Sequence, residues 1–217
     1  MTEEEKQRFR DLKENVVKAL QKNWPHIENQ YRKKLDDTDR RIMQYTECVA
    51  FAPDKHNLYE ILGVARFFQL LAKYGWKKQR VKKFFKFYEH LRFSGVNGRQ
   101  RYKLTPVQAF QFASIYGFSR PDGRRLVRTA YLFVPRKFSK TTSAAALAVY
   151  DMLFGDNNAQ AYVGANSYEQ AKICFDEIRA IMQDIDPREK HFRINREKIT
   201  FKDRGRDSLI QCLTANA

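Results

Sequence analysis

The segment at residues 134–142 (VPRKFSKTT) carries residue types that could bind the phosphates of a nucleotide. It follows a run of β-branched and aromatic residues at 129–134 that predicts a buried strand, and it precedes an alanine-rich helix expected from about 140 to 154. The exposed amides and the dipole at the N-terminus of such a helix favour an anion. We therefore expect the Lys140 ammonium group to reach the β- and γ-phosphates and the Thr141 hydroxyl to ligate Mg²⁺.

The segment matches the phosphate-loop pattern G-x-x-x-x-G-K-[ST] only in its Lys-Thr pair, because Val134 and Ser139 occupy the two glycine positions. The alternative is that these residues simply form the basic first turn of a crossover helix. Lysine and arginine are unfavourable near the positive end of a helix dipole. That alternative therefore accounts poorly for Arg136, Lys137 and Lys140.

The upstream sequence Leu-Thr-Pro-x-Gln, at residues 104–108, has two interpretations. In the first, Thr105 is the N-cap of a helix, Pro106 is its first residue and Gln108 completes a capping box. In the second, the Gln108 carboxamide reads adenine, since it offers a donor and an acceptor to the N6 and N7 edge of the base. Both roles remain open on the sequence alone.

The order and spacing of these segments resemble the large terminase subunit of tailed bacteriophages. The resemblance covers about residues 100–217, including the segments at 104–108, 135–141, 162–171 and 199–217. It implies an ATP-driven motor that moves double-stranded viral DNA into a procapsid, with a C-terminal nuclease domain in the full-length protein. It also implies the portal and the small terminase subunit as partners, a homo-oligomer when full length, a location in the host cytoplasm and no membrane association.

The resemblance further implies roles for individual residues. Arg136 matches the family's loop arginine and Lys140 its phosphate-binding lysine, and these two are expected to be catalytic. Thr141 matches the Mg²⁺ ligand, and Gln108 matches the glutamine of the adenine motif. Ser139 departs from the family, in which glycine is usual. The residues expected to bind ATP are Gln108, Pro135, Arg136, Lys137, Phe138, Ser139, Lys140, Thr141 and Thr142.

The composition is that of a folded, basic protein. The 217 residues are 43% hydrophobic, which excludes global disorder, and a formal charge of +16 favours nucleic acid over a membrane as a partner. The longest mostly apolar run, at 143–154, is too short to span a bilayer. We expect the three cysteines (48, 174 and 212) to be buried free thiols. The four histidines (26, 56, 90 and 191) show no metal-binding spacing and no triad with Ser and Asp.

The chain divides in two by its hydrophobic periodicity. Helical spacing predicts a helical N-terminal region at 1–95, which ends in turn formers at 94–98. The order strand, loop, helix, strand, helix then predicts a parallel-sheet α/β domain of the P-loop NTPase type at 96–217, incomplete at its C-terminus. Its strands are expected at 129–134, 159–164, 192–194, 198–202 and 208–214.

The last helix before the boundary interleaves aromatic residues with Lys77, Lys78, Lys82 and Lys86. This pattern is typical of an ordinary solvated face, and it equally suits a surface that contacts the DNA backbone without reading bases.

The sequence shows no apolar strand ending in Asp-Glu, the Walker B element that would hold the Mg²⁺ shell and orient the attacking water. We therefore expect the chain to be the front portion of a longer protein, with nucleotide-binding residues but weak or no ATP hydrolysis by itself. Two other functions fit the sequence. One is a helicase-like P-loop NTPase, and the other is a basic, non-enzymatic nucleic-acid-binding protein in which the Lys-Thr pair is accidental.

Overall fold

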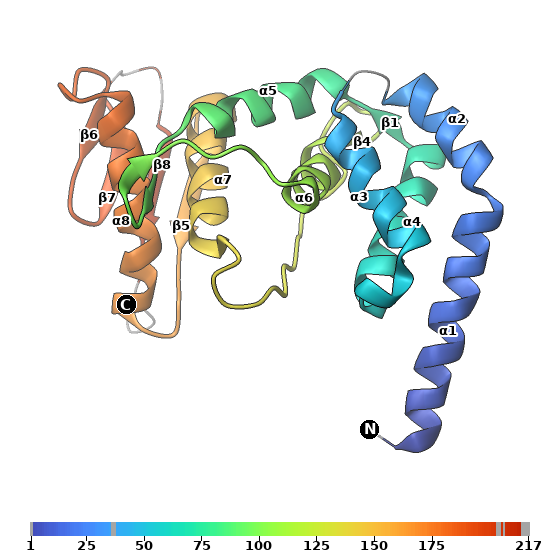
Figure 1. The fold of residues 1–217 in the computed structure, drawn as a ribbon. Helices are drawn as coiled ribbons and strands as arrows, with labels where there is room; N and C mark the ends of the chain where they lie inside the picture. The colour runs from blue at the N-terminus through green and yellow to red at the C-terminus, as the bar shows by residue number, and fades with distance from the viewer. Residues whose placement is uncertain (1, 36–37, 203–204, 206, 214–217) are drawn as a thin grey trace. The chain divides into compact units, whose positions relative to one another are not determined.

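A computed structural model describes residues 2–35, 38–202, 205 and 207–213 of the chain (Figure 1). The fold is mixed α/β, as the sequence predicts. The chain forms two compact units, and each is built from two separate stretches of sequence. Unit 1 comprises residues 1–86 and 104–131, and unit 2 comprises residues 87–103 and 132–217. The predicted domain boundary at 95/96 falls inside a hairpin of unit 2 and stays a prediction.

Unit 1 is mainly helical. Its elements are α1 (Glu3–Lys22), α2 (Trp24–Lys34), α3 (Arg40–Phe51), the 3₁₀ turn η1 (Pro53–Lys55), α4 (Leu58–Lys73), β1 (Gly75–Trp76), α5 (Lys78–His90) as far as residue 86, α6 (Pro106–Tyr116) and β4 (Phe118–Ser119). Strands β1 and β4 pair antiparallel.

Local capping signals set where these helices begin. Thr2 and Glu5 form a capping box at the start of α1, and Asn57 and Glu60 form another at the start of α4. A proline lies in the first turn of α2, where it is compatible with the start of a new helix.

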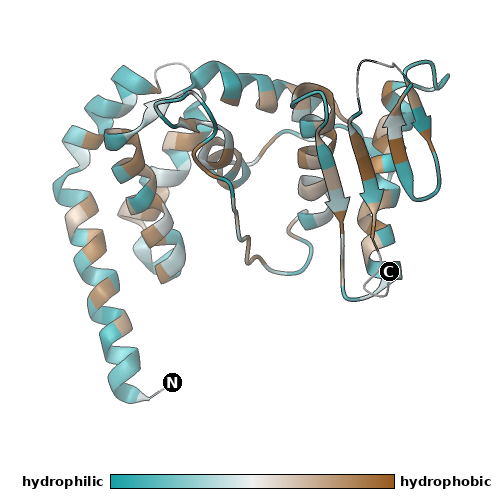
Figure 2. Cartoon of the chain, turned by 180° about the vertical axis from the view of Figure 1, so that it is seen from behind, coloured by the Kyte–Doolittle hydropathy of each residue, from teal (hydrophilic) through white to brown (hydrophobic). Residues whose placement is uncertain are grey.

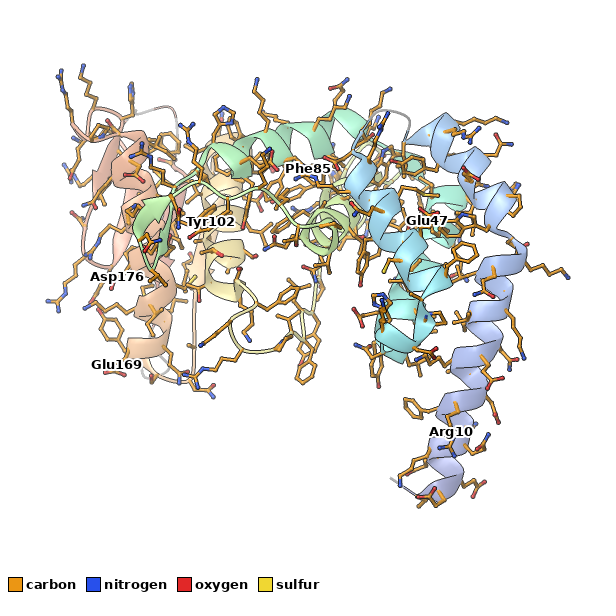
Figure 3. The ribbon with its side chains drawn as sticks, viewed as in Figure 1. Arg10, Glu47, Phe85, Tyr102, Glu169 and Asp176 are labelled. Carbon is orange, nitrogen blue, oxygen red and sulfur yellow. The ribbon has the colours of Figure 1, made fainter. Side chains whose placement is uncertain are left out.

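The core of unit 1 is aromatic. Phe67, Phe112 and Phe118 are almost completely buried. The rings of Phe67 and Phe118 lie 5.3 Å apart at 67°, and Phe84 stacks on Tyr116 at 4.6 Å. Such contacts supplement the free energy of burial by about 1 kcal/mol per pair. The N-terminal half of α1 lies outside this core. It is mostly hydrophilic in Figure 2, and its exposed side chains, Arg10 among them, point away from the other helices in Figure 3.

Unit 2 contains a four-stranded sheet with two helices packed against it. Its elements are the end of α5, β2 (Phe93–Gly95), β3 (Gly98–Gln100), α7 (Lys140–Phe154), β5 (Gln160–Val163), α8 (Tyr168–Ile185), β6 (Phe192–Ile194), β7 (Lys198–Phe201) and β8 (Leu209–Cys212). The strand order is β5-β8-β7-β6, and β2 pairs with β3 in a separate hairpin. The turn formers predicted at 94–98 make the tip of that hairpin.

The sheet of unit 2 is parallel only between β5 and β8, while β8–β7 and β7–β6 are antiparallel. The prediction of a parallel sheet is therefore confirmed only in part. The reason lies in the connections, because the few residues that join β6 to β7 and β7 to β8 are too short for a parallel crossover. The last predicted strand, at 208–214, forms as β8 from Leu209 to Cys212, and residue 214 lies outside the described residues.

The strand predicted at residues 129–134 does not form. This segment is extended, makes no backbone pairing with any described strand and leaves Tyr131 and Phe133 86% and 90% exposed. A strand needs a neighbour to satisfy its N–H and C=O groups, and β-propensity alone does not supply one. The prediction of a buried strand here is wrong for the described residues.

Candidate nucleotide-binding site

The loop before α7 ends in a helix N-terminus with free amides. Helix α7 begins at Lys140, as predicted, and its first turn contains no acidic residue. Ser139 is the N-cap, but its side chain makes no capping hydrogen bond. The Ser139 carbonyl accepts hydrogen bonds from the Ser143 amide and the Thr142 hydroxyl, both at 2.9 Å. The first amides of α7 therefore remain available to an anion.

The backbone of the loop is left-handed at two positions. Ser139 has φ 55° and ψ 30°, and Lys137 has φ 67°. This region of backbone space costs a non-glycine residue about 1–2 kcal/mol. Ser139 thus adopts the conformation that glycine favours at the position where the P-loop pattern has glycine. The residue type therefore differs from the P-loop pattern at this position, but the backbone conformation is the one that glycine would adopt.

Three cationic side chains belong to the loop and to the first residue of α7. The Lys140 ammonium group donates hydrogen bonds to the carbonyl oxygens of Val134 at 2.9 Å and Pro135 at 3.0 Å. Arg136 and Lys137 are exposed, and neither makes a hydrogen bond or ion pair through its side chain with another described residue. No carboxylate among the described residues therefore neutralises Arg136 or Lys137. The donor set of cations and helix amides fits a phosphate group.

The two threonines are held differently. The hydroxyl of Thr142 is hydrogen-bonded to Tyr88, whose pKa burial raises and this hydrogen bond lowers, with burial the larger effect. The Thr141 carbonyl accepts a weak 3.9 Å contact from the Cys174 thiol. The Thr141 hydroxyl makes no side-chain hydrogen bond with a described residue, so this oxygen is compatible with binding Mg²⁺. However, the described residues contain no group of three or more His, Cys, Asp or Glu side chains that could hold a metal.

Gln108 forms the capping box that the first interpretation of its sequence predicts. Its Oε1 accepts hydrogen bonds from the Thr105 amide and the Thr105 hydroxyl, both at 3.0 Å. The side chain is 8% exposed, and its Nε2 makes no hydrogen bond with a described residue. Gln108 lies in unit 1 and the loop lies in unit 2, so adenine recognition stays a prediction.

A comparison with models of protein families matches residues 106–217 to the ATPase domain of terminase large subunits. The match covers more than half of the chain. The chain belongs to the terminase large subunit family. The matched range begins at the first residue of α6 and contains both Gln108 and the whole loop. Comparisons with curated proteins and with solved structures gave no match.

The terminase-type chain carries a basic helix upstream of this range. Helix α5 buries Val81, Phe84 and Phe85. Lys83 and Lys86 are exposed, as is Lys77 just before the helix, whereas Lys78 and Lys82 are half-buried. The described part of the chain contains no helix that is both long enough and apolar enough to cross a bilayer.

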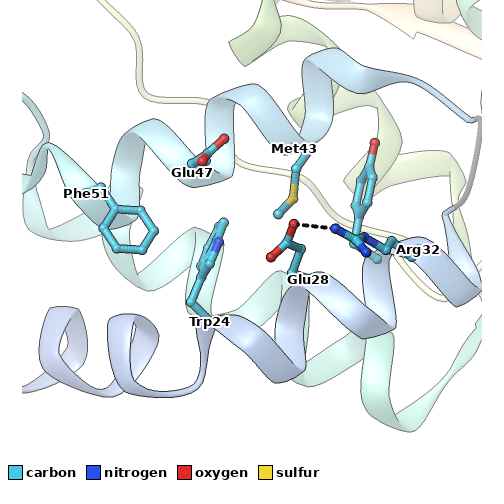
Figure 4. Close-up of a pocket in the computed structure, with 7 residues that line it drawn as sticks. Trp24, Glu28, Arg32, Met43, Glu47 and Phe51 are labelled. Carbon is cyan, nitrogen blue, oxygen red and sulfur yellow. Dashed lines mark hydrogen bonds and ion pairs between the residues drawn. The ribbon is translucent and has the colours of Figure 1, made fainter.

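A separate hollow lies between α2 and α3 in unit 1, with a volume of about 490 Å³ (Figure 4). Glu28 and Arg32, from α2, form a 3.1 Å ion pair beside it, and Met43 and Glu47 face them from α3. Trp24 and Phe51 contact edge to face at 5.2 Å at the other end. All the residues that line this hollow belong to unit 1, so it is not part of the loop site.

Proposed function

We propose that the loop at residues 134–142 binds the phosphates of ATP and that the chain provides the ATPase part of a DNA-packaging motor. One observation carries the proposal. Within the range matched to terminase ATPases, an uncapped helix N-terminus coincides with a left-handed Ser139. Among the described residues, the Lys140 ammonium group there bonds only to carbonyls of its own loop. The family match favours this function over the helicase-like alternative.

In this proposal Lys140, Arg136 and Thr141 have separate tasks, and the other loop residues contribute further contacts. Lys140 exchanges its two carbonyl acceptors for phosphate oxygens, and Arg136 neutralises charge at the γ-phosphate. The Thr141 hydroxyl is a ligand for Mg²⁺. The remaining predicted contacts, from Pro135, Lys137, Phe138, Ser139 and Thr142, come from the loop backbone and its flanking side chains. Bound ATP supplies the phosphoryl group whose hydrolysis drives DNA movement.

The partners in this proposal are those of a packaging motor. Double-stranded DNA contacts the lysines of α5, and a portal and a small terminase subunit complete the assembly. In this proposal the protein acts as a homo-oligomer in the host cytoplasm. A protein that tracks the backbone needs exposed cations and no base-reading motif, which agrees with the exposed Lys77, Lys83 and Lys86.

Titration of the chain with a fluorescent ATP analogue in the presence of Mg²⁺ tests the proposal. Lys140→Ala should weaken binding by about tenfold or more, because a charge-assisted hydrogen bond contributes about 1.5–3 kcal/mol. Lys198→Ala is the matched control, since it removes the same charge from an exposed side chain of unit 2. Equal affinity of Lys140→Ala and wild type would leave a basic, non-enzymatic nucleic-acid-binding protein as the better account.

A further inference from the structure

Three side chains from different parts of unit 1 line up as a thiol, a base and a carboxylate. Cys48 lies on α3, His56 follows η1 and Glu60 lies in the first turn of α4 (Figure 1). The Cys48 Sγ is 3.5 Å from the His56 Nε2, and the His56 Nδ1 is 3.4 Å from the Glu60 Oε1. Both contacts are long for hydrogen bonds, as such contacts often are in the absence of a reactant.

The carboxylate in this line is firmly held. The Glu60 Oε2 accepts hydrogen bonds from the Asn57 amide at 2.9 Å and the Asn57 side chain at 2.8 Å, within the capping box of α4. The Tyr45 hydroxyl donates to the Glu60 Oε1 at 3.2 Å. A carboxylate accepts hydrogen bonds, so the His56 Nδ1 carries the proton and its Nε2 presents a lone pair to the Cys48 thiol.

The surroundings of His56 contain few other ionisable groups. Tyr45 meets the imidazole edge to face at 6.0 Å, and the Lys13 ammonium group donates to the His56 carbonyl at 2.9 Å. The imidazole itself is 12% exposed. It is therefore shielded from water on most sides while its Nε2 faces the thiol.

The other two thiols of the chain lie in different environments. Cys48 is exposed, Cys174 is half-buried and Cys212 is buried. The predicted burial is therefore confirmed for Cys212, reached only in part by Cys174 and wrong for Cys48. Burial raises the pKa of the Cys174 thiol to about 11, and it also raises the pKa of Cys212. Both are poor nucleophiles for that reason. Only Cys48 combines exposure with a neighbouring base among the described cysteines.

We propose that Cys48 is a reactive thiol that His56 and Glu60 activate, and that it forms mixed disulfides with small-molecule disulfides of the glutathione type. This site is independent of the proposed nucleotide site. The His56 Nε2 takes the proton of the Cys48 thiol, and Glu60 stabilises the resulting imidazolium. The thiolate attacks one sulfur of the disulfide, the S–S bond of the reagent breaks, and the leaving thiolate takes the proton from His56. One thiol is consumed and one is released, with no net change in oxidation state.

The test is the rate at which each cysteine of the whole chain forms a mixed disulfide with oxidised glutathione, measured by mass-spectrometric peptide mapping. Cys174 and Cys212 are internal references in the same sample. Cys48 should react fastest. His56→Asn should slow Cys48 by about tenfold or more at neutral pH, in line with the loss of a general base, and should leave the two references unchanged. Glu60→Gln should slow Cys48 as well, while its amide oxygen keeps the capping box.

The pH dependence separates activation from mere exposure. The rate at Cys48 should therefore depend on pH differently in wild type and in His56→Asn, because only the wild type has a base beside the thiol. Fluorescence of Trp24 and Trp76, both in unit 1, reports whether a variant is folded. Identical rates and profiles for wild type and His56→Asn, or no adduct at Cys48, would overturn the proposal.

Discussion

The Lys140 ammonium group donates a hydrogen bond to the carbonyl oxygen of Val134, six residues earlier, at 2.9 Å. A second hydrogen bond to the neighbouring Pro135 carbonyl holds the same charge over the loop. The lysine is therefore positioned by neutral acceptors, which a phosphate can replace without breaking an ion pair. The left-handed backbone at Ser139 lies immediately before the first turn of α7. The chain changes direction at this residue, between the Val134 and Pro135 carbonyls and the lysine that bonds to them.

The first prediction concerns the left-handed backbone at Ser139. Ser139→Gly should raise the free energy of unfolding by no more than about 1 kcal/mol, since relief of αL strain is partly offset by the entropy of glycine in the unfolded chain. Ser139→Val should lower it by about 1–3 kcal/mol, because a β-branched residue fits this conformation badly. Urea denaturation measures both, and ATP affinity should fall in the valine variant alone. A valine variant as stable as the glycine variant would contradict this account of the loop.

The second prediction separates the two interpretations of Gln108. Glutamate suits the same capping position, so Gln108→Glu should change the free energy of unfolding by less than about 0.5 kcal/mol. It removes the Nε2 donor that adenine recognition requires. The preference for ATP over GTP should therefore fall by about tenfold, the value of one hydrogen bond. Competition binding with the two nucleotides measures it.

Thr105→Ala is the control for this pair. It removes the cap and should cost about 1 kcal/mol of stability while it leaves the base preference intact. An unchanged preference in Gln108→Glu would restrict this glutamine to its capping role.

Sequence reasoning found the elements whose boundaries depend on neighbouring residues. The cap at Thr105 and the start of α7 at Lys140 follow from residues that are neighbours in the sequence. The strand expected at 129–134 failed because pairing depends on a distant partner. The left-handed backbone of Ser139 could not be predicted from the sequence, because serine rarely adopts this conformation.

The thiol site was missed for a related reason. His56 and Glu60 are four residues apart, a spacing that places two side chains near each other at a helix start. Cys48 joins them only because the chain turns through η1 between α3 and α4. The sequence shows the three residue types, but the approach of Cys48 to His56 depends on the packing of α3 beside α4.

The third prediction uses the carboxylate at the end of α8. Although burial by itself raises the pKa of Asp186, hydrogen bonds from the amides of His191, Lys190 and Phe192, at 2.7–3.0 Å, hold that pKa below its usual range. A depressed carboxyl pKa stabilises the fold above the unfolded value of about 3.9, and this contribution is lost as the pH falls through the folded value. Asp186→Asn should therefore destabilise the protein at pH 7, and the difference from wild type should shrink below about pH 4.

Urea denaturation across this pH range measures the effect. Asp156→Asn is the matched control, because its exposed side chain makes no hydrogen bond or ion pair with a described residue of the protein and the charge change is the same. A constant difference between Asp186→Asn and wild type from pH 7 to pH 3 would show that the three amide hydrogen bonds do not stabilise the charged form.

The fourth prediction tests the basic surface of α5. Replacement of the exposed Lys77, Lys83 and Lys86 together by glutamine should weaken binding to double-stranded DNA equally for unrelated sequences of the same length, because backbone contacts carry no base information. The slope of log K against log salt should become shallower by up to about 2.7, the value for three released counterions. Fluorescence anisotropy at several salt concentrations measures both quantities.

A second triple variant controls for net charge in this experiment. Lys22, Lys33 and Lys55 are exposed lysines of the same unit, and their replacement by glutamine removes the same three charges elsewhere. If a specific surface binds DNA, this control should lose much less affinity and keep its salt slope. Equal losses in the two triple variants would mean that DNA responds to the overall charge of +16 and that no particular lysines form the contact.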